Sequence, residues 1–327
     1  NFSSPLESIT EMYALPGKND IDPSGVMAFF YYLFFGMMLS DAGYGVIMVV
    51  LSYILLKKVN LEVNTKKTFR MFFYCGISTI FWGALYGSWF GDIVQIVSRQ
   101  FFNTEAPSLA IWFEPINDPI KLLLFSFVLG ILHLFVGLGV NAKIAWDRGD
   151  KLDAVLDSLP VYLLVLGAAP LAAGVLTSVP PPIASIAKYV ALSGVALVIL
   201  TSGRKSKNIF GKLFGGLYGL YSIASGYLND ILSYSRLLAL GLATGSIAGV
   251  INLMGTMPEN LIVKGILITV VFVVGHTLNI AINLLGAYVH TNRLQFVEFF
   301  SKFYEGGGRP FTPLKINTKF FSIKEKM

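Results

Sequence analysis

The sequence has little of what a soluble enzyme or a disulfide-stabilised secreted protein needs. Of its 327 residues only 13% are charged, and the single cysteine, Cys75, excludes an internal disulfide. The histidines form no cluster with metal-ligand spacing, and no Ser/His/Asp set is present. Residues 306–308 are three glycines, but the Lys and Ser or Thr that a phosphate-binding loop requires do not follow them. We therefore expect no metal, no cofactor and no catalytic site within this chain.

Hydrophobic residues dominate instead. They make up 54% of the chain, and the mean hydropathy is +0.66, values typical of a polytopic membrane protein. Apolar segments that are long enough to span a bilayer occupy residues 26–56, 70–97, 119–146, 153–177, 182–201, 210–255 and 261–303. The sequence thus predicts an all-α membrane protein in contact with lipids. Its excess of positive charge lies mostly in short loops, which argues against nucleic acid as a partner.

Polar segments flank the apolar ones. Residues 1–25 carry Pro and Gly punctuation and are expected to form a connector. Residues 26–304 form the predicted membrane domain, and residues 305–327 a cytoplasmic tail. The first residue is Asn1 rather than Met, and no signal peptide follows. We expect the chain to be a fragment whose upstream part is missing.

Charges in the short loops predict which side of the membrane each loop occupies. Basic residues gather at 57–70, 204–212 and 315–326, whereas the loop at 98–118 is acidic and residues 180–182 carry no charge. Basic loops tend to stay in the cytoplasm, so the first three are predicted to lie inside and the last two outside.

The first apolar segment leaves the topology open, because residues 40–45 (SDAGYG) interrupt it. A single crossing would place the N-terminus outside. If the chain folds back at the interruption, each arm has about fourteen residues and is roughly 21 Å long, short of the roughly 30 Å hydrocarbon core. Charge bias alone does not decide between the two.

The last apolar segment contains a regular polar stripe. Its members recur every three or four residues and so share one face of a helix: His276, Asn279, Asn283, Gly286, His290 and Arg293. An arginine near the membrane centre is unfavourable by roughly 2.5–3.5 kcal/mol on insertion scales. Amides and histidines alone would suggest that the stripe holds neighbouring helices together. The arginine favours a functional stripe that faces a partner charge or a water-filled cavity.

A second stripe lies in the preceding segment. After an interfacial lead-in at residues 211–218, a helix is predicted over about 226–254. Polar residues again follow three-to-four spacing around a second arginine, on a face that contains Asn229, Ser233, Arg236, Leu240 and Thr244. Asp230 lies one step off this face, where it could pair with Arg236 through a neighbour or line an entrance. The short external loop makes the last two helices antiparallel neighbours, and their length requires tilt.

Around both arginines the sequence resembles one family, the membrane half of the large stator subunit of V/A-type rotary ATPases. This is subunit a of eukaryotes and subunit I of prokaryotes. The resemblance is carried by residues 232–243 (LSYSRLLALGLA) and 290–304 (HTNRLQFVEFFSKFY). The segments at 4–13, 40–45, 86–92 (YGSWFGD) and 306–313 (GGGRPFTP) are also similar, so the resemblance covers the whole chain.

The resemblance implies eight membrane segments, with the first apolar segment folding back and both ends cytoplasmic. It further implies a static subunit that does not hydrolyse ATP, in the plasma membrane of a prokaryote. Arg236 and Arg293 would face the buried carboxylates of a rotating proteolipid ring (subunit c or K). The missing N-terminal half would contact the peripheral stalks and the soluble ATPase sector. Polar residues of the two stripes would line half-channels for the ion: His276, Asn279, Asn283, His290, Ser233, Asn229, Thr244 and Asp230.

Two positions depart from the family pattern. Asn283 and Thr244 are uncharged where the eukaryotic members often carry an acidic residue and a histidine. This departure favours Na⁺ over H⁺ as the coupling ion. Asp41 and Asp92 are further candidates for an access path, but each suits a helix cap or a loop contact equally well.

A stand-alone secondary transporter is the alternative, because such proteins also have broken helices and polar residues at the membrane midplane. Its intramembrane arginines would bind substrate or ion. No internal repeat relates the two halves of the chain, and the polar groups gather in the last two helices. Both observations favour the stator.

Overall fold

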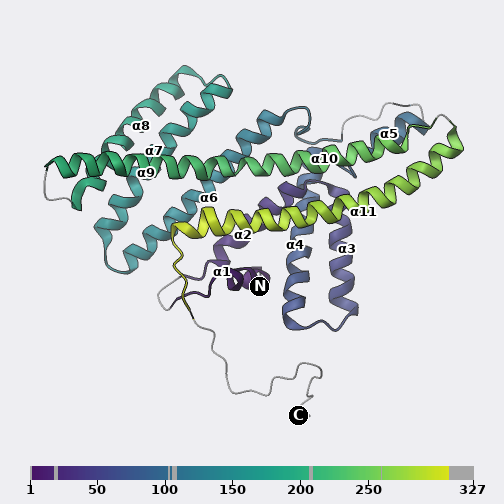
Figure 1. The fold of residues 1–327 in the computed structure, drawn as a ribbon, viewed down its shortest axis with the longest axis horizontal. Coiled ribbons are helices and arrows are strands. Elements are labelled where there is room, and N and C mark those ends of the chain that lie inside the picture. Colours follow the sequence, from purple (N-terminus) through teal and green to yellow (C-terminus); the bar gives the residue numbers. More distant parts are fainter. Residues whose placement is uncertain are drawn as a thin grey trace, which may run out of the picture.

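The structure, a computed structural model, describes residues 2–17, 21–101, 104, 109–205, 209–258 and 260–308. Within these ranges the chain is mostly helical, with no β-strand and a single isolated bridge between Trp89 and Asp92 (Figure 1). Long apolar helices sufficient to cross a membrane occupy Pro119–Asp147, Lys151–Leu176, Pro181–Ser202, Phe210–Gly255 and Ile262–Lys302. The predicted all-α membrane fold is confirmed.

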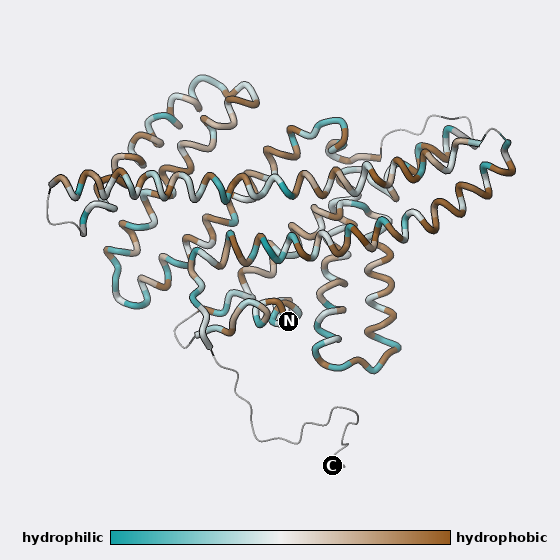
Figure 2. The backbone as a smooth tube through the Cα atoms, in the orientation of Figure 1, coloured by the Kyte–Doolittle hydropathy of each residue, from teal (hydrophilic) through white to brown (hydrophobic). Residues whose placement is uncertain are grey.

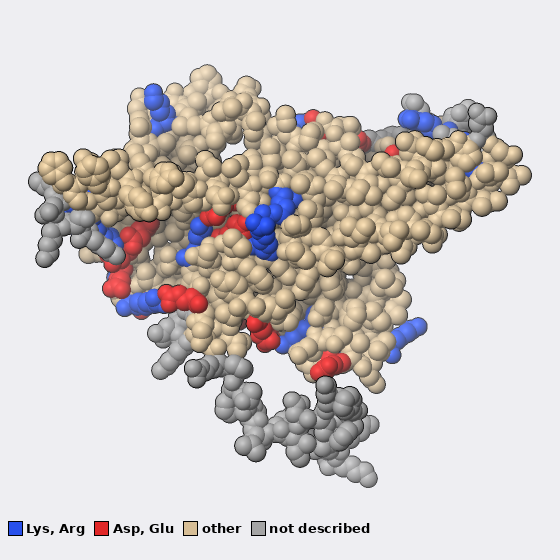
Figure 3. Space-filling model, viewed as in Figure 1, with Lys and Arg blue, Asp and Glu red and all other residues tan. Residues whose placement is uncertain are grey.

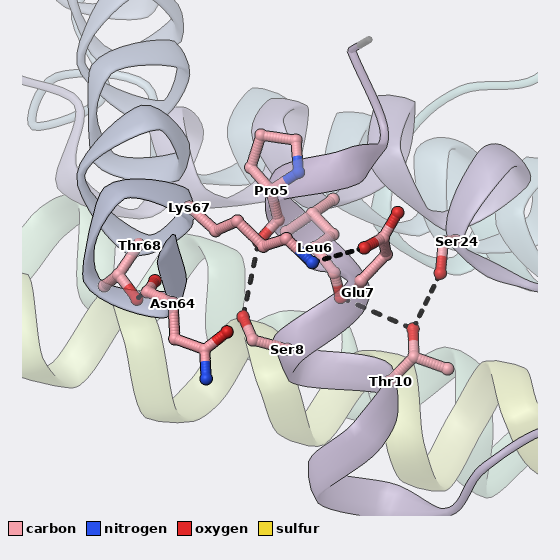
Figure 4. A network of polar contacts seen from close by, with 9 residues as sticks. All are labelled: Pro5, Leu6, Glu7, Ser8, Thr10, Ser24, Asn64, Lys67 and Thr68. Carbon is pink, nitrogen blue, oxygen red and sulfur yellow. Dashed lines mark hydrogen bonds and ion pairs between the residues drawn. The ribbon is translucent and has the colours of Figure 1, made fainter. Parts of the chain in front are cut away.

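The N-terminal segment is an anchored part of the fold. It forms a 3₁₀ turn (Ser4–Leu6) and helix α1 (Glu7–Tyr13), shown in Figure 4. Glu7 forms an ion pair of 2.5 Å with Lys67 of α4 (Val63–Tyr86). The Thr10 and Ser24 hydroxyls are 3.0 Å apart, which fixes α1 against the start of α2 (Ser24–Leu39). The predicted connector therefore packs directly on the membrane domain.

The first apolar segment is broken where the sequence predicts, into α2 and α3 (Ala42–Lys58). Ser40 at the break has a φ of 41°, in the left-handed region. Asp41 then caps α3, because its carboxylate accepts the backbone N–H of Tyr44 at 3.1 Å. Figure 1 shows α2 approaching the break and α3 running away from it, with α4 packed beside both. The two arms contain 16 and 17 residues, slightly more than expected.

The middle of the chain forms α5 (Ile93–Phe101), α6 (Pro119–Asp147), α7 (Lys151–Leu176) and α8 (Pro181–Ser202). Helices α7 and α8 make an antiparallel hairpin with close backbone approach. A Cβ at Gly167 would lie 2.2 Å from the backbone nitrogen of Ala191, and a Cβ at Gly194 would lie 2.5 Å from that of Leu164. Small residues at a helix interface permit such contacts in a membrane, where burial of apolar area contributes little.

Two long helical runs end the fold. Helices α9 (Ile209–Ser233) and α10 (Ser235–Gly255) form one rod with an irregularity at Tyr234. The predicted division into a lead-in and a helix that begins near residue 226 is wrong, because the Gly- and Tyr-rich residues join α9 directly. Helix α11 (Leu261–Arg293) packs antiparallel to α10, as predicted, and continues into a π-helical turn (Leu294–Phe299) and a 3₁₀ turn (Phe300–Lys302).

These runs are long, and they cross α3 and α4 at a steep angle (Figure 1). This arrangement agrees with the tilt expected of the last two helices. Figure 2 shows them as mostly hydrophobic, with hydrophilic residues interrupting the middle of the rod and of α11. Those interruptions are the two stripes. The predicted tail at 305–327 lies outside the described residues from position 309 onward.

Candidate functional site

A group of charged side chains lies between the α9–α10 rod and the end of α11, in the middle of the face that Figure 3 shows, whereas the other charges of that face lie nearer its edges. Arg236, at the start of α10, has a side chain only 17% exposed. Its Nη2 donates to the Ser233 hydroxyl at 2.9 Å, and that hydroxyl donates to Glu298 Oε1. Arg236 Nη1 is 4.0 Å from the same carboxylate oxygen. The first arginine is therefore held from within the chain.

A second ion pair adjoins the first. Asp230 of α9 accepts from Lys302, whose ammonium also lies 4.4 Å above the ring of Tyr227. The sequence suggests a pairing of Asp230 with Arg236 through a neighbour, but the partner is Lys302. The π-helical turn and 3₁₀ turn after Arg293 continue the helical run and set the position of Lys302, which reaches Asp230 on α9. Both acidic residues of the group are therefore paired within the protein.

Arg293 differs from Arg236. Its side chain is exposed at the end of α11, and within the described residues it makes no hydrogen bond or ion pair. His290, one turn earlier, is partly buried and lies close enough to both arginines to sense their charges. Asn229 is exposed on α9. The two arginine motifs thus meet at one place, with one guanidinium anchored and the other available to a partner.

The rest of the α11 stripe is buried in a separate network. His276 Nδ1 is 2.6 Å from the hydroxyl of Tyr44 on α3, and its Nε2 is 2.9 Å from Asn252 Oδ1 on α10. Asn279 donates to the Tyr44 oxygen at 2.7 Å, and Asn283 donates to Asn279 Oδ1 at 2.5 Å. The network joins α3 to the last two helices, α10 and α11, which are far from it in sequence.

All the hydrogen bonds of this network run in one direction. Asn252 Nδ2 donates to the Phe90 carbonyl at 2.8 Å and to Asp92 Oδ1 at 3.0 Å, so its own oxygen must accept. His276 therefore carries its proton on Nε2, and its Nδ1 accepts from Tyr44. The chain of donors therefore ends at a carboxylate: Asn283 donates to Asn279, Asn279 to Tyr44, Tyr44 to His276, His276 to Asn252, and Asn252 to Asp92. An aligned chain of this kind is mutually reinforcing and holds each side chain in one orientation.

Thr244 lies beside the network. It is 1% exposed, its hydroxyl donates to the Leu240 carbonyl at 3.0 Å, and its own carbonyl accepts from Asn279 at 3.4 Å. Asp41 is also a structural contact: beyond capping α3, it accepts from Ser88 Oγ at 2.7 Å and from the backbone N–H of Gly91 at 2.8 Å. The simpler interpretation of Asp41, a cap and loop contact, describes these bonds fully.

A cavity of about 590 Å³ follows one side of α10. Gly241, Gly245 and Gly249 line it from the helix, since their spacing of four leaves a groove along one face. Thr256 lines its other end, so it spans fifteen residues of helix, about 22 Å at 1.5 Å per residue. Asp92 lines the cavity too, and therefore joins it to the buried network.

Sequence reasoning missed several participants. Glu298 and Lys302 lie within the arginine motif, but the π-helical turn moves them off the three-to-four spacing used to find the stripes. Tyr44, within the interruption at residues 40–45, and Asn252, in an apolar helix, are not among the residues predicted for either stripe. Within the described parts of the chain, no group of three or more His, Cys, Asp or Glu could hold a metal ion.

Comparison with known proteins bears on this arrangement. A sequence model of the V-type ATPase 116kDa subunit family matches residues 226–316, which contain both arginines and Glu298. The A-type ATP synthase subunit I of Methanocaldococcus jannaschii is 33% identical over 97% of this chain and 48% of its own length. That of Thermococcus kodakarensis is 35% identical over 96% of this chain and 46% of its own length.

The V-type ATP synthase subunit I of Borreliella burgdorferi is 29% identical, over 96% of this chain and 52% of its own length. The chain thus spans about half the length of the curated relatives it matches. The resemblance read from the arginine motifs is confirmed, and the chain is a homologue of the V-type ATPase 116kDa subunit family, whose prokaryotic relatives are named subunit I.

Proposed function

We propose that this chain is the static ion-translocating part of the membrane sector of a V/A-type rotary ATPase. It couples movement of H⁺ or Na⁺ to rotation of a ring of proteolipid subunits. The observation that carries this proposal is the meeting of Arg236 and Arg293 on two long apolar helices, close enough for their charges to interact. Charges within membrane helices are costly and usually mark an ion path. The names of the relatives agree with this function.

The chemistry depends on a charge that cannot be lost. A ring carboxylate that carries H⁺ or Na⁺ is neutral and can pass through lipid. Opposite a guanidinium it favours the ionised, unloaded state, because a nearby positive charge lowers the pKa of a carboxyl group. Arginine suits this role because it remains protonated on burial, whereas a buried lysine readily loses its proton. The same charge repels a cation that would otherwise leak past the ring.

Two offset half-channels must bring the ion to the ring and take it away. We assign the external one to the cavity beside α10 and the buried network that meets it at Asp92. His276, Asn279 and Asn283 border this path. His290, Ser233, Asn229, Thr244 and Asp230 remain predictions for the lining near the arginines. In this proposal both ends of the chain are cytoplasmic: the basic loops favour this for the C-terminus, and the family resemblance favours it for the N-terminus.

Purification tests this assignment directly. The full-length protein, extracted gently from its native membrane, is expected to travel with a small multi-copy proteolipid and large soluble ATPase subunits. Mass spectrometry of the intact complex would identify both. Recovery of the protein alone, or as a homo-oligomer, would contradict the stator function and favour a secondary transporter that uses the arginines to bind its substrate.

The coupling ion has its own test. Because Asn283 and Thr244 are uncharged, we expect ATP-driven uptake into vesicles to require Na⁺ and to survive a protonophore. Uptake that is independent of Na⁺ and collapses on addition of the protonophore would contradict this expectation and identify H⁺ as the coupling ion.

A further inference from the structure

The guanidinium of Arg236 has a partner that the two stripes do not predict. Glu298, on the π-helical turn after α11, is 2% exposed and points at Ser233, which lies between it and the arginine. The Arg236 and Glu298 side chains approach to 4.0 Å without a direct hydrogen bond. Opposite charges at this distance attract strongly wherever water is excluded.

The contact between them is incomplete. Arg236 Nη1 and Glu298 Oε2 are both buried, and neither has a hydrogen-bond partner. Buried polar atoms are nearly always paired, so atoms left unpaired are informative. One guanidinium nitrogen is committed to Ser233, and Nη1 faces Glu298 at 4.0 Å without a hydrogen bond. The arginine is therefore held beside Glu298 without being saturated by it.

Other charges surround the pair. Lys302 is neutralised by Asp230, and Arg293 and His290 lie near enough to Arg236 to interact with its charge. Tyr234, buried beside Glu298, shares a hydrogen bond of 2.8 Å with His133 and carries no charge. Glu298 is therefore the negative charge nearest Arg236 within the described residues.

We propose that Glu298 is a positioning residue for ion translocation: an internal counter-ion that holds Arg236 between the passage of successive ring carboxylates. This proposal rests on the function proposed above. When a loaded, neutral carboxylate faces Arg236, Glu298 compensates the guanidinium. When the carboxylate unloads, the guanidinium pairs with it, while Ser233 keeps the arginine aimed. Glu298 thereby limits how strongly the unloaded state is favoured, and reloading stays fast.

The test uses Glu298→Gln in the complete, purified complex reconstituted into vesicles. Without the negative charge, Arg236 stabilises the ionised ring carboxylate more strongly, so loading requires more ion. We expect the ion concentration for half-maximal ATP-driven uptake to rise about tenfold, equivalent to a shift of one pKa unit. Glu298→Asp retains the charge and should restore most of the wild-type value. Asp153→Asn, in the ion pair with Arg204, is the matched control and should leave the value unchanged.

Ser233→Ala tests whether Glu298 positions Arg236 through Ser233 or only stabilises the fold. In the wild-type background it should lower uptake, whereas added to Glu298→Gln it should have little further effect, because Ser233 acts by linking the pair. An unchanged half-maximal concentration in Glu298→Gln, with uptake still abolished by Arg236→Ala, would overturn the counter-ion role and leave the proposed function intact. Normal uptake in Arg236→Ala would instead overturn the proposed function.

Discussion

Replacing Arg236 with alanine is expected to reduce ATP-driven ion uptake to background while the complex still assembles. Among the described residues its hydrogen bond and its ion pair are with Ser233 and Glu298, and its side chain remains partly exposed. Its removal should therefore cost little packing. It would, however, leave a ring carboxylate with no positive charge to favour unloading. ATP-driven uptake by vesicles, alongside the subunit composition of the purified complex, measures both effects.

Arg293→Ala should have the same result, since its exposed guanidinium has no partner within the described residues and is free for the ring. Arg236→Lys should not rescue uptake fully, because an ammonium presents a single point charge and can lose its proton when buried. Arg204→Ala provides the control arginine: it pairs with Asp153 at 3.0 Å and Asp157 at 3.1 Å, away from the site. Normal uptake by either the Arg236 or the Arg293 variant would remove the function proposed for that residue.

Gly83→Ala is expected to destabilise the protein strongly, although it adds only one methyl group. Gly83 on α4 lies against the start of α3, and a Cβ there would be 2.1 Å from the backbone nitrogen of Ala42. Backbone cannot move aside as a flexible side chain can. The two helices would have to separate, which would disturb the Asp41 cap and the bonds from Ser88 and Gly91. Overpacking of this kind costs about 1–3 kcal/mol and occasionally more.

The thermal midpoint of the purified complex and its yield from membranes would both fall in this variant. Gly265→Ala is the matched control, because nothing lies within 4 Å of a Cβ at that position of α11. Alanine is the better helix former by about 0.5–1 kcal/mol, so the control should be neutral or slightly more stable. An unchanged midpoint in Gly83→Ala would show that α3 and α4 are less tightly apposed than the structure indicates.

The sequence predicts the helices and both polar stripes because each depends on local spacing. Residues such as His276, Asn279 and Asn283 recur at helical intervals, and a helix of any tilt keeps them on one face. The break at Ser40 is predictable for the same reason, since an Asp before an apolar run is a recognised cap. The similarity to subunit I relatives then supports the family, whereas the role of each single stripe residue stays a prediction.

What the sequence does not predict depends on packing between distant segments. Tyr44 meets His276 across 232 positions, and nothing local in either segment indicates the other. Glu298 is not predicted because a π-helical turn changes the helical period directly after Arg293, where the stripe ends. Asp230 has several basic residues within reach, and only the fold selects Lys302. The direction of the buried network likewise depends on Asp92, which a loop supplies.

The anchoring of the N-terminal segment also has a mechanical consequence. The turns that follow α11 meet this segment: Tyr304 donates to the Ala14 carbonyl at 2.7 Å, and the Gly308 N–H to that of Leu15 at 3.0 Å. Tyr13 packs its ring against Phe296, Phe300 and Tyr304. In the proposed motor, a turning ring would drag on α11 tangentially. That load would pass through these contacts into α1, and from there through the Glu7–Lys67 ion pair into α4. The helix that bears the torque is thus braced at its end, so that rotation of the ring would produce work rather than bending of the stator.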